Sequence, residues 1–189
     1  MTKKELRKTY NDKRNQLSPT QKEKLDDLIL IQFQKLPLPY LHTLLSFWPM
    51  QGKNEINTHA ITDFLLFRNP GLQIAYPVTN FLTCEMKAIL TNDDTDFKLN
   101  EYAILEPVSG DELPAKKIDA VLIPMLIFDK NGNRVGYGKG FYDRYLANCK
   151  KDILKIGLSY FEPEKTIDDI HQYDIKLSSC ITPHNIFEF

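Results

Sequence analysis

The sequence predicts an α/β fold, a three-layer sandwich built on a mostly parallel sheet. Short apolar runs of strand length alternate with longer segments of helical periodicity. Over residues 43–76 the order is strand, helix, strand with short links, which is the pattern of a βαβ crossover between parallel strands. With 189 residues and no internal repeat or low-complexity linker, we expect one domain over residues 1–189.

Two helices are expected at the start of the chain. Leu6 and Tyr10 recur at helical spacing and predict a weakly amphipathic helix over residues 3–16. Ser18, Pro19 and Gln21 form the sequence of a capping box, so a second helix begins there. Pro37 and Pro39 should end this helix. Its apolar stripe should pack on a sheet and consists of Leu25, Leu28, Ile29, Ile31, Phe33 and Leu36.

The rest of the chain supplies the strands. Thr43–Trp48 is a continuous apolar run typical of a strand buried on both faces. Asn57 or Thr58 should cap a helix that ends near Phe67 and uses Ile61, Phe64, Leu65 and Phe67. A further helix is expected over Gly140–Asn148, and further strands over Leu72–Tyr76, Cys84–Leu90, the region around Tyr102, Asp119–Pro124 and Lys155–Ser159.

Composition limits the classes of partner. Lys and Arg total 24 against 25 Asp and Glu, so the net charge of -1 gives no general attraction to nucleic acids or anionic membranes. Three widely spaced cysteines favour reduced thiols in a cytoplasm, and the four histidines show no zinc spacing. No apolar run has signal-peptide length or nears the ~20 residues of a membrane span. We therefore expect a cytoplasmic protein without nucleic-acid or membrane partners.

The segment Asp119–Leu146 carries the strongest functional signal. A strand, a long polar loop, three alternate glycines within Gly136–Gly140 and a new helix follow one another. Glycine lets backbone approach a ligand closely, and amides at a helix start attract anions, so a phosphate-bearing ligand is expected. Arg134, Lys139 and Arg144 add positive charge.

The glycine spacing alone leaves another interpretation open. It matches neither the Walker nor the dinucleotide pattern, and a mobile connection with solvated charges would look similar. Tyr137, Phe141 and Tyr142 favour an aromatic-walled pocket, because flexible linkers seldom carry three rings. Asp143 is either a helix-end carboxylate or a magnesium ligand, with a second ligand from Asp168, Asp169 or Asp174.

The run P-M-L-I-F-D-K-N-G-N-R-V-G-Y-G-K-G-F-Y-D-R resembles the signature of the 5-formyltetrahydrofolate cyclo-ligases, also called 5,10-methenyltetrahydrofolate synthetases. The resemblance extends to K-K-E-L-R, to the Arg14–Ser18 segment, to E-I-N-T from Glu55 and to Y-D-I-K-L from Tyr173. It implies a fold similar to sugar-isomerase and CoA-transferase domains. It also implies a monomer or weak homodimer that uses ATP and Mg²⁺ to cyclise 5-formyltetrahydrofolate to 5,10-methenyltetrahydrofolate, releasing ADP and phosphate through a phosphorylated N5-formyl intermediate.

The resemblance also implies roles for individual residues. Lys139 and Arg134 would be catalytic, and Asp143 and Asp174 would hold the metal ion. ATP would be bound by Lys3, Lys4, Arg7, Arg134, Val135, Gly136, Tyr137, Gly138, Lys139, Gly140, Phe141 and Tyr142. The folate would be bound by Trp48, Glu55, Tyr137, Gly138, Lys139, Gly140 and Phe141.

Three other functions compete with this interpretation. A small-molecule kinase or phosphoribosyl-type transferase would use the same glycine loop without folate. A folate- or nucleotide-binding module would bind without releasing ADP. A nucleic-acid binder is the weakest alternative, because the basic first helix is only a local patch.

Overall fold

A mostly parallel sheet forms the centre of the computed structural model, which describes residues 1–50 and 52–189. Its seven strands lie in the order β11-β10-β9-β6-β1-β2-β3. The neighbours from β10 to β2 pair in parallel, while β11 and β3 are antiparallel edges. The strands are β1 (Thr43–Leu45), β2 (Gln73–Asn80), β3 (Glu85–Thr91), β6 (Ala120–Ile123), β9 (Leu154–Leu158), β10 (Ser179–Ile181) and β11 (Ile186–Glu188).

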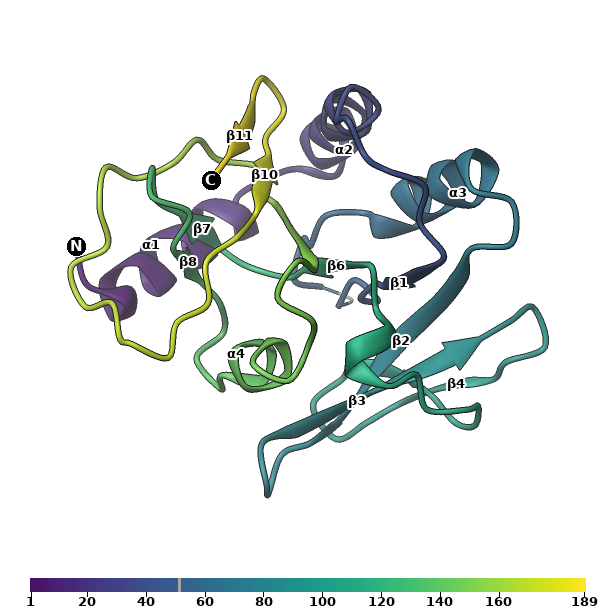
Figure 1. Ribbon diagram of the computed structural model, residues 1–189. Helices are drawn as coiled ribbons and strands as arrows, with labels where there is room; N and C mark the ends of the chain where they lie inside the picture. Colours follow the sequence, from purple (N-terminus) through teal and green to yellow (C-terminus); the bar gives the residue numbers. More distant parts are fainter. Residues whose placement is uncertain (51) are drawn as a thin grey trace.

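Helices cover both faces of this sheet. Helices α2 (Pro19–Phe33) and α3 (Thr58–Arg68) lie on one side of β1 and β6, and α1 (Lys3–Asn15) and α4 (Phe141–Leu146) lie on the other (Figure 1). Leu44 and Leu122 pack in the core under α2 and α3, whereas their neighbours Leu45 and Val121 pack in the core under α1 and α4. This alternation confirms the predicted three-layer sandwich.

The predicted helix starts are confirmed. The side chain of Ser18 accepts the N–H of Gln21 in a complete capping box, and Asn57 caps α3 through the N–H of His59. The predicted apolar stripes are wrong at two positions. Ile31 of α2 is 49% exposed and Phe67 of α3 is 88% exposed, because each lies outside the helix face that meets the sheet.

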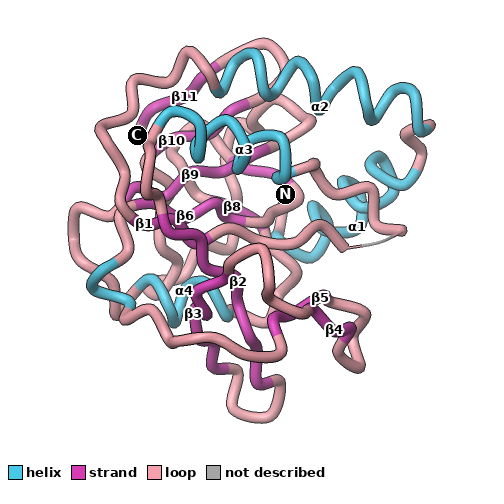
Figure 2. The backbone as a smooth tube through the Cα atoms, turned by 90° about the vertical axis from the view of Figure 1, so that its right-hand side faces the viewer, coloured by secondary structure: helices cyan, strands magenta, loops and turns pink. Residues whose placement is uncertain are grey.

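Two predicted strands differ from the structure. Strand β1 ends at Leu45 instead of Trp48, because only the N–H of Ser46 still bonds to β2, through the carbonyl of Ala75. The region around Tyr102 is a hairpin of β4 (Phe97–Leu99) and β5 (Leu105–Pro107), with Tyr102 in its turn. Figure 2 shows this hairpin beside β2 and β3, at the end of the molecule opposite α2.

The segment expected to be a polar loop is a buried hairpin. Strands β7 (Ile127–Phe128) and β8 (Arg134–Val135) pair antiparallel, and the Asp129 carboxylate accepts the backbone N–H groups of Asn131 and Asn133 in the turn. A short 3₁₀ turn, η1 (Ala115–Lys117), precedes β6. Helix α4 is shorter than predicted, and β10 and β11 were not predicted. No helix among residues 1–50 and 52–189 has the length and apolarity to cross a bilayer.

Candidate active site

A cavity of about 900 Å³ opens at the carboxyl ends of β1 and β6. From β1 the chain continues to β2 on one side, while β6 lies on the other, so the strand order changes direction between them. Ligands of open α/β sheets bind outside such a point. Phe47 and Trp48, which follow β1, line the cavity together with Pro124 and Leu126, which follow β6.

The structure gathers nearly all of the predicted site residues around this one cavity. The exception is Val135, whose side chain is fully buried in the core, so only its backbone is available to a ligand. The predicted residues that line the cavity are Lys3, Lys4, Arg7, Trp48, Glu55, Arg134, Gly136, Tyr137, Gly138, Lys139, Gly140, Phe141, Tyr142, Asp143 and Asp174. Their individual roles stay predictions.

Both carboxylates predicted to hold metal are paired with cations. Lys3 Nζ of α1 donates to Oδ2 of Asp174, and Nη2 of Arg134 donates to Oδ1 of Asp143 at 2.8 Å. Arg134 also donates to the carbonyl of Ile175. Burial raises the pKa of Asp174, but the hydrogen bond and charge of Lys3 and the N–H of His171 outweigh it, so the pKa is lowered.

Each of these carboxylates keeps one oxygen open. Within the described part of the chain, neither Oδ2 of Asp143 nor Oδ1 of Asp174 accepts a hydrogen bond. Residues 1–50 and 52–189 contain no group of three or more His, Cys, Asp or Glu placed to hold a metal. Asp143 and Asp174 are thus two lining carboxylates that each have an oxygen available to a cation.

The glycine loop is held from both sides. Arg7 Nε of α1 donates to the carbonyl of Gly136 at 2.9 Å. Gly138 has φ +94°, and a Cβ there would lie 3.2 Å from the guanidinium carbon of Arg7. Arg144 donates to the carbonyl of Lys139 at 2.5 Å and to that of Cys84 at 3.0 Å. The Lys139 side chain is exposed and makes no ion pair with any described residue.

A buried acid, Glu55, lines the same cavity. Glu55 is 4% exposed, and its Oε2 accepts the backbone N–H of Met50 at 2.7 Å. Tyr137 of the glycine loop donates its hydroxyl to Oε1, and Arg14 of α1 donates to the same hydroxyl at 2.7 Å. Burial raises the pKa of Glu55, against the lowering effect of the Met50 and Tyr137 hydrogen bonds and of the Arg14 charge.

Aromatic rings form the apolar wall. Trp48 packs against Tyr76 and Phe97, with ring centroids 5.7 and 4.6 Å away. Phe81 stacks on Tyr102 with ring centroids 3.6 Å apart, and Phe141 makes a T-shaped contact with Phe81 at 5.0 Å. Wide flat walls of this kind suit a planar ring system.

Comparison with models of known protein families shows to which family this chain belongs. The model of the 5-formyltetrahydrofolate cyclo-ligase family matches residues 1–174. The chain belongs to this family. A 5-formyltetrahydrofolate cyclo-ligase of Mycoplasma pneumoniae is 31% identical over 85% of this chain and 86% of its own length. One from Haemophilus influenzae is 35% identical over 56% of this chain and 58% of its own length.

A solved structure of the same family has the same fold. It is the NMR structure of a 5,10-methenyltetrahydrofolate synthetase from Aquifex aeolicus, with a TM-score of 0.81 and 26% identity. The superposition covers 100% of this chain and 93% of the other. The predicted resemblance to the cyclo-ligase family is therefore confirmed, as is the α/β fold.

Several lining residues were not predicted, and neither was one residue that lies behind the lining. Phe81 and Tyr102 come from hairpins that nothing in their spacing links to the glycine loop. Arg14 had a detectable signal, because it continues the buried i, i+4 stripe of Leu6 and Tyr10 on α1. An arginine on the apolar face of a helix needs a buried acceptor, and here that acceptor is Tyr137.

Proposed function

We propose that the chain catalyses the ATP-dependent cyclisation of 5-formyltetrahydrofolate to 5,10-methenyltetrahydrofolate, with release of ADP and phosphate. The observation that carries the proposal is that, in a member of the cyclo-ligase family, one cavity joins a cationic end to an aromatic end that contains a buried acid. A cavity of about 900 Å³ has the size of a large ligand site. Both cores form on one sheet, which supports a single domain over residues 1–189.

The cationic end suits the triphosphate. Lys4 and Lys139 line it as exposed cations, and Arg7 holds the glycine loop by its Nε. In our proposal the formyl oxygen attacks the γ-phosphorus and the bond to ADP breaks. Charge spreads over the phosphoryl oxygens in such a step, so Lys139 and Arg134 would provide most of their stabilisation there.

The aromatic end suits the folate. The pterin ring would lie against Trp48 and the rings of the glycine loop, and the Glu55 carboxylate would accept hydrogen bonds from the pterin N–H groups. N10 then adds to the activated carbon, its proton is released, and the C–O bond breaks as phosphate leaves. The position of both ligands in one cavity supplies the proximity that this ring closure needs.

Magnesium fits the chemistry of this donor set. Mg²⁺ is commonly held by one or two carboxylates, with phosphate oxygens and water as the other ligands. Asp143 and Asp174 line the cavity, and each has one carboxylate oxygen free of hydrogen bonds within the described residues. Bound there with ATP, the ion would neutralise phosphate charge, while Arg134 and Lys3 would keep the two carboxylates in place.

One spectrophotometric assay tests the activity. Protein, ATP, Mg²⁺ and 5-formyltetrahydrofolate together should produce the methenyl absorbance together with stoichiometric ADP, and omission of ATP should abolish both signals. ADP release that does not depend on folate would indicate a kinase of another substrate. Stoichiometric binding of folate without ADP release would indicate a binding module.

A further inference from the structure

Three side chains, of which Tyr137 and Glu55 line the cavity and Arg14 lies behind them, are joined by hydrogen bonds. Arg14 comes from the last turn of α1, Tyr137 from the glycine loop and Glu55 from the segment before α3. Arg14 Nη2 donates to the Tyr137 hydroxyl at 2.7 Å, and that hydroxyl donates to Oε1 of Glu55. Arg14 and Glu55 are each only 4% exposed.

We infer that Arg14 is a positioning residue that acts through Tyr137 to hold the Glu55 carboxylate ready to accept hydrogen bonds from the folate ring. This inference rests on the proposed function. It assigns to Arg14 no contact with either substrate, and Arg14 does not line the 900 Å³ cavity.

The direction of the hydrogen bonds carries the argument. A guanidinium can only donate, so the Tyr137 hydroxyl uses a lone pair for Arg14, and its proton is available for Oε1 of Glu55, to which it donates. The backbone N–H of Met50 donates to the second carboxylate oxygen at 2.7 Å. Both known partners of the carboxylate are therefore donors, and Glu55 is fixed as an acceptor. The remaining lone pairs suit a ligand edge that presents N–H groups, as a reduced pterin does.

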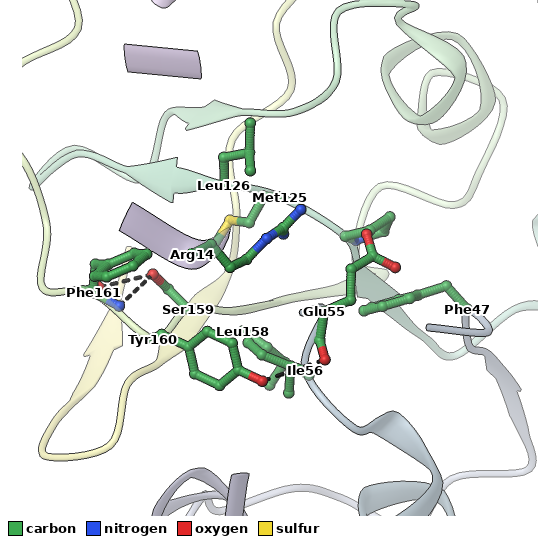
Figure 3. A pocket seen from close by; sticks show the side chains of 11 residues that line it. Arg14, Phe47, Glu55, Ile56, Met125, Leu126, Leu158, Ser159, Tyr160 and Phe161 are labelled. Atoms are coloured by element: carbon green, nitrogen blue, oxygen red, sulfur yellow. Dashed lines mark hydrogen bonds between the residues drawn. The ribbon is translucent and has the colours of Figure 1, made fainter. Parts of the chain in front are cut away.

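The surroundings of Arg14 show why its effect reaches Glu55. Figure 3 shows the guanidinium and the Glu55 carboxylate beside one small cavity of about 10 Å³, roughly the space of one water molecule. Among the described residues, the Arg14 side chain has one hydrogen-bond acceptor, the hydroxyl of Tyr137. The Nε of Arg14 has no hydrogen-bond partner there. The hydrogen bond to Tyr137 is charge-assisted and therefore strong, and the Arg14 charge also acts on the Glu55 carboxylate.

The backbone reinforces the same connection. The side-chain amide of Asn54 donates to the carbonyls of Arg14 and Leu17, at 3.0 and 3.1 Å. Asn54 itself adopts a left-handed conformation, with φ 46°, immediately before Glu55. The end of α1 thus fixes the backbone of the Glu55 segment as well as its carboxylate.

Ligand binding without turnover tests this inference. We would titrate 5-formyltetrahydrofolate and, separately, ATP with Mg²⁺ into wild type, Arg14→Met, Tyr137→Phe and the double variant by calorimetry. We expect each single variant to weaken folate binding about tenfold and ATP binding less than twofold. The double variant should match the singles, because the two residues act as one unit. Arg14→Lys, which restores a donor, should recover part of the folate affinity.

Two controls separate positioning from general damage. Lys13→Met removes a neighbouring cation of α1 that lies over the Tyr10 ring, and Tyr173→Phe removes a hydroxyl from an exposed tyrosine. Both should leave the two affinities unchanged. Unchanged folate affinity in Tyr137→Phe, or equal loss of both ligands in Arg14→Met, would overturn the inference. Wild type that binds folate without turnover would overturn only the proposed activity, and wild type that binds no folate would overturn both.

Discussion

Replacing Asp143 by alanine removes an acceptor that two parts of the protein share. Its Oδ1 accepts hydrogen bonds from Nη2 of Arg134 at 2.8 Å and from the backbone N–H of Ile175 at 3.0 Å. The Arg134 side chain is 6% exposed. After the substitution its guanidinium would keep the carbonyl of Ile175 but lose its counter-charge.

The expected loss of stability follows from this burial. Breaking a buried ion pair by removing one partner costs about 3–5 kcal/mol. Because 29% of the Asp143 side chain is exposed, water can enter the gap, and we expect the lower end, about 3 kcal/mol. For a chain of this length that lowers the melting temperature by about 6–12 °C. Alanine is therefore not a neutral probe of metal binding at this position.

Thermal unfolding followed by circular dichroism measures the effect. Glu112→Ala is the matched control, since Glu112 pairs with Lys87 in an exposed ion pair, which is worth about 1 kcal/mol or less. Asp143→Asn keeps an acceptor for Ile175 and should lose less stability than alanine. If Asp143→Ala melted at the temperature of the Glu112→Ala control, the pair with Arg134 would not be holding this segment. In that case Asp143→Ala could be used directly in magnesium titrations.

Three further predictions concern single side chains. Lys139→Met should lower kcat by a factor that corresponds to about 2–4 kcal/mol and leave the melting temperature unchanged, because the side chain is exposed; wild-type turnover would contradict its role. Glu55→Gln should raise the KM for folate more than that for ATP in steady-state kinetics, and an effect on ATP alone would contradict the placement. For Asp119, burial raises the pKa, but hydrogen bonds from Lys150 and the N–H of His42 outweigh it and lower the pKa. The stability from Asp119 is thus full above about pH 4 and lost as pH falls through the lowered pKa. The urea midpoints of wild type and Asp119→Asn should therefore differ at pH 7 and converge as the pH is lowered through that pKa.

Local chemistry made the helices and the parallel strands predictable. Ser18 and Asn57 cap α2 and α3 because their side chains satisfy free N–H groups, a property that needs no distant partner. The strands β1 and β6 were found because a strand buried on both faces must be apolar throughout. Ile31 and Phe67 were misplaced because apolar residues occur on more than one face of their helices, and only packing selects the face.

The missed strands depend on pairing between distant or short segments. The strands of the β7–β8 hairpin are two residues long, which is too short for a sequence pattern to distinguish them from loop, even beside the turn residues of Asp129–Asn133. Strand β10 pairs with β9 across an irregular segment of about twenty residues, so its partner is set by the fold and not by spacing.

The residues of the site also divide into those that the sequence predicts and those that only the fold brings together. The glycine loop and its cations are contiguous in sequence and could be proposed from it. The pairing of Lys3 with Asp174 joins residues 171 positions apart, and that of Tyr137 with Glu55 joins residues 82 apart. No spacing rule connects such pairs, because the folding of the whole domain brings their segments together.

The charges of the cavity would allow a chain with a net charge of -1 to attract the nucleotide of the proposed reaction. Of the described lining residues, Lys3, Lys4, Arg7, Lys8, Lys53, Arg134 and Lys139 are cationic, whereas Glu55, Asp143, Asp169 and Asp174 are carboxylates. Two of the carboxylates are already paired with Lys3 and Arg134, so the excess positive charge lies on the exposed lysines. A triphosphate with its magnesium ion still carries net negative charge, and it can bind this excess without breaking either ion pair. The pairs would then keep the open carboxylate oxygens in position for the cation that arrives with the nucleotide.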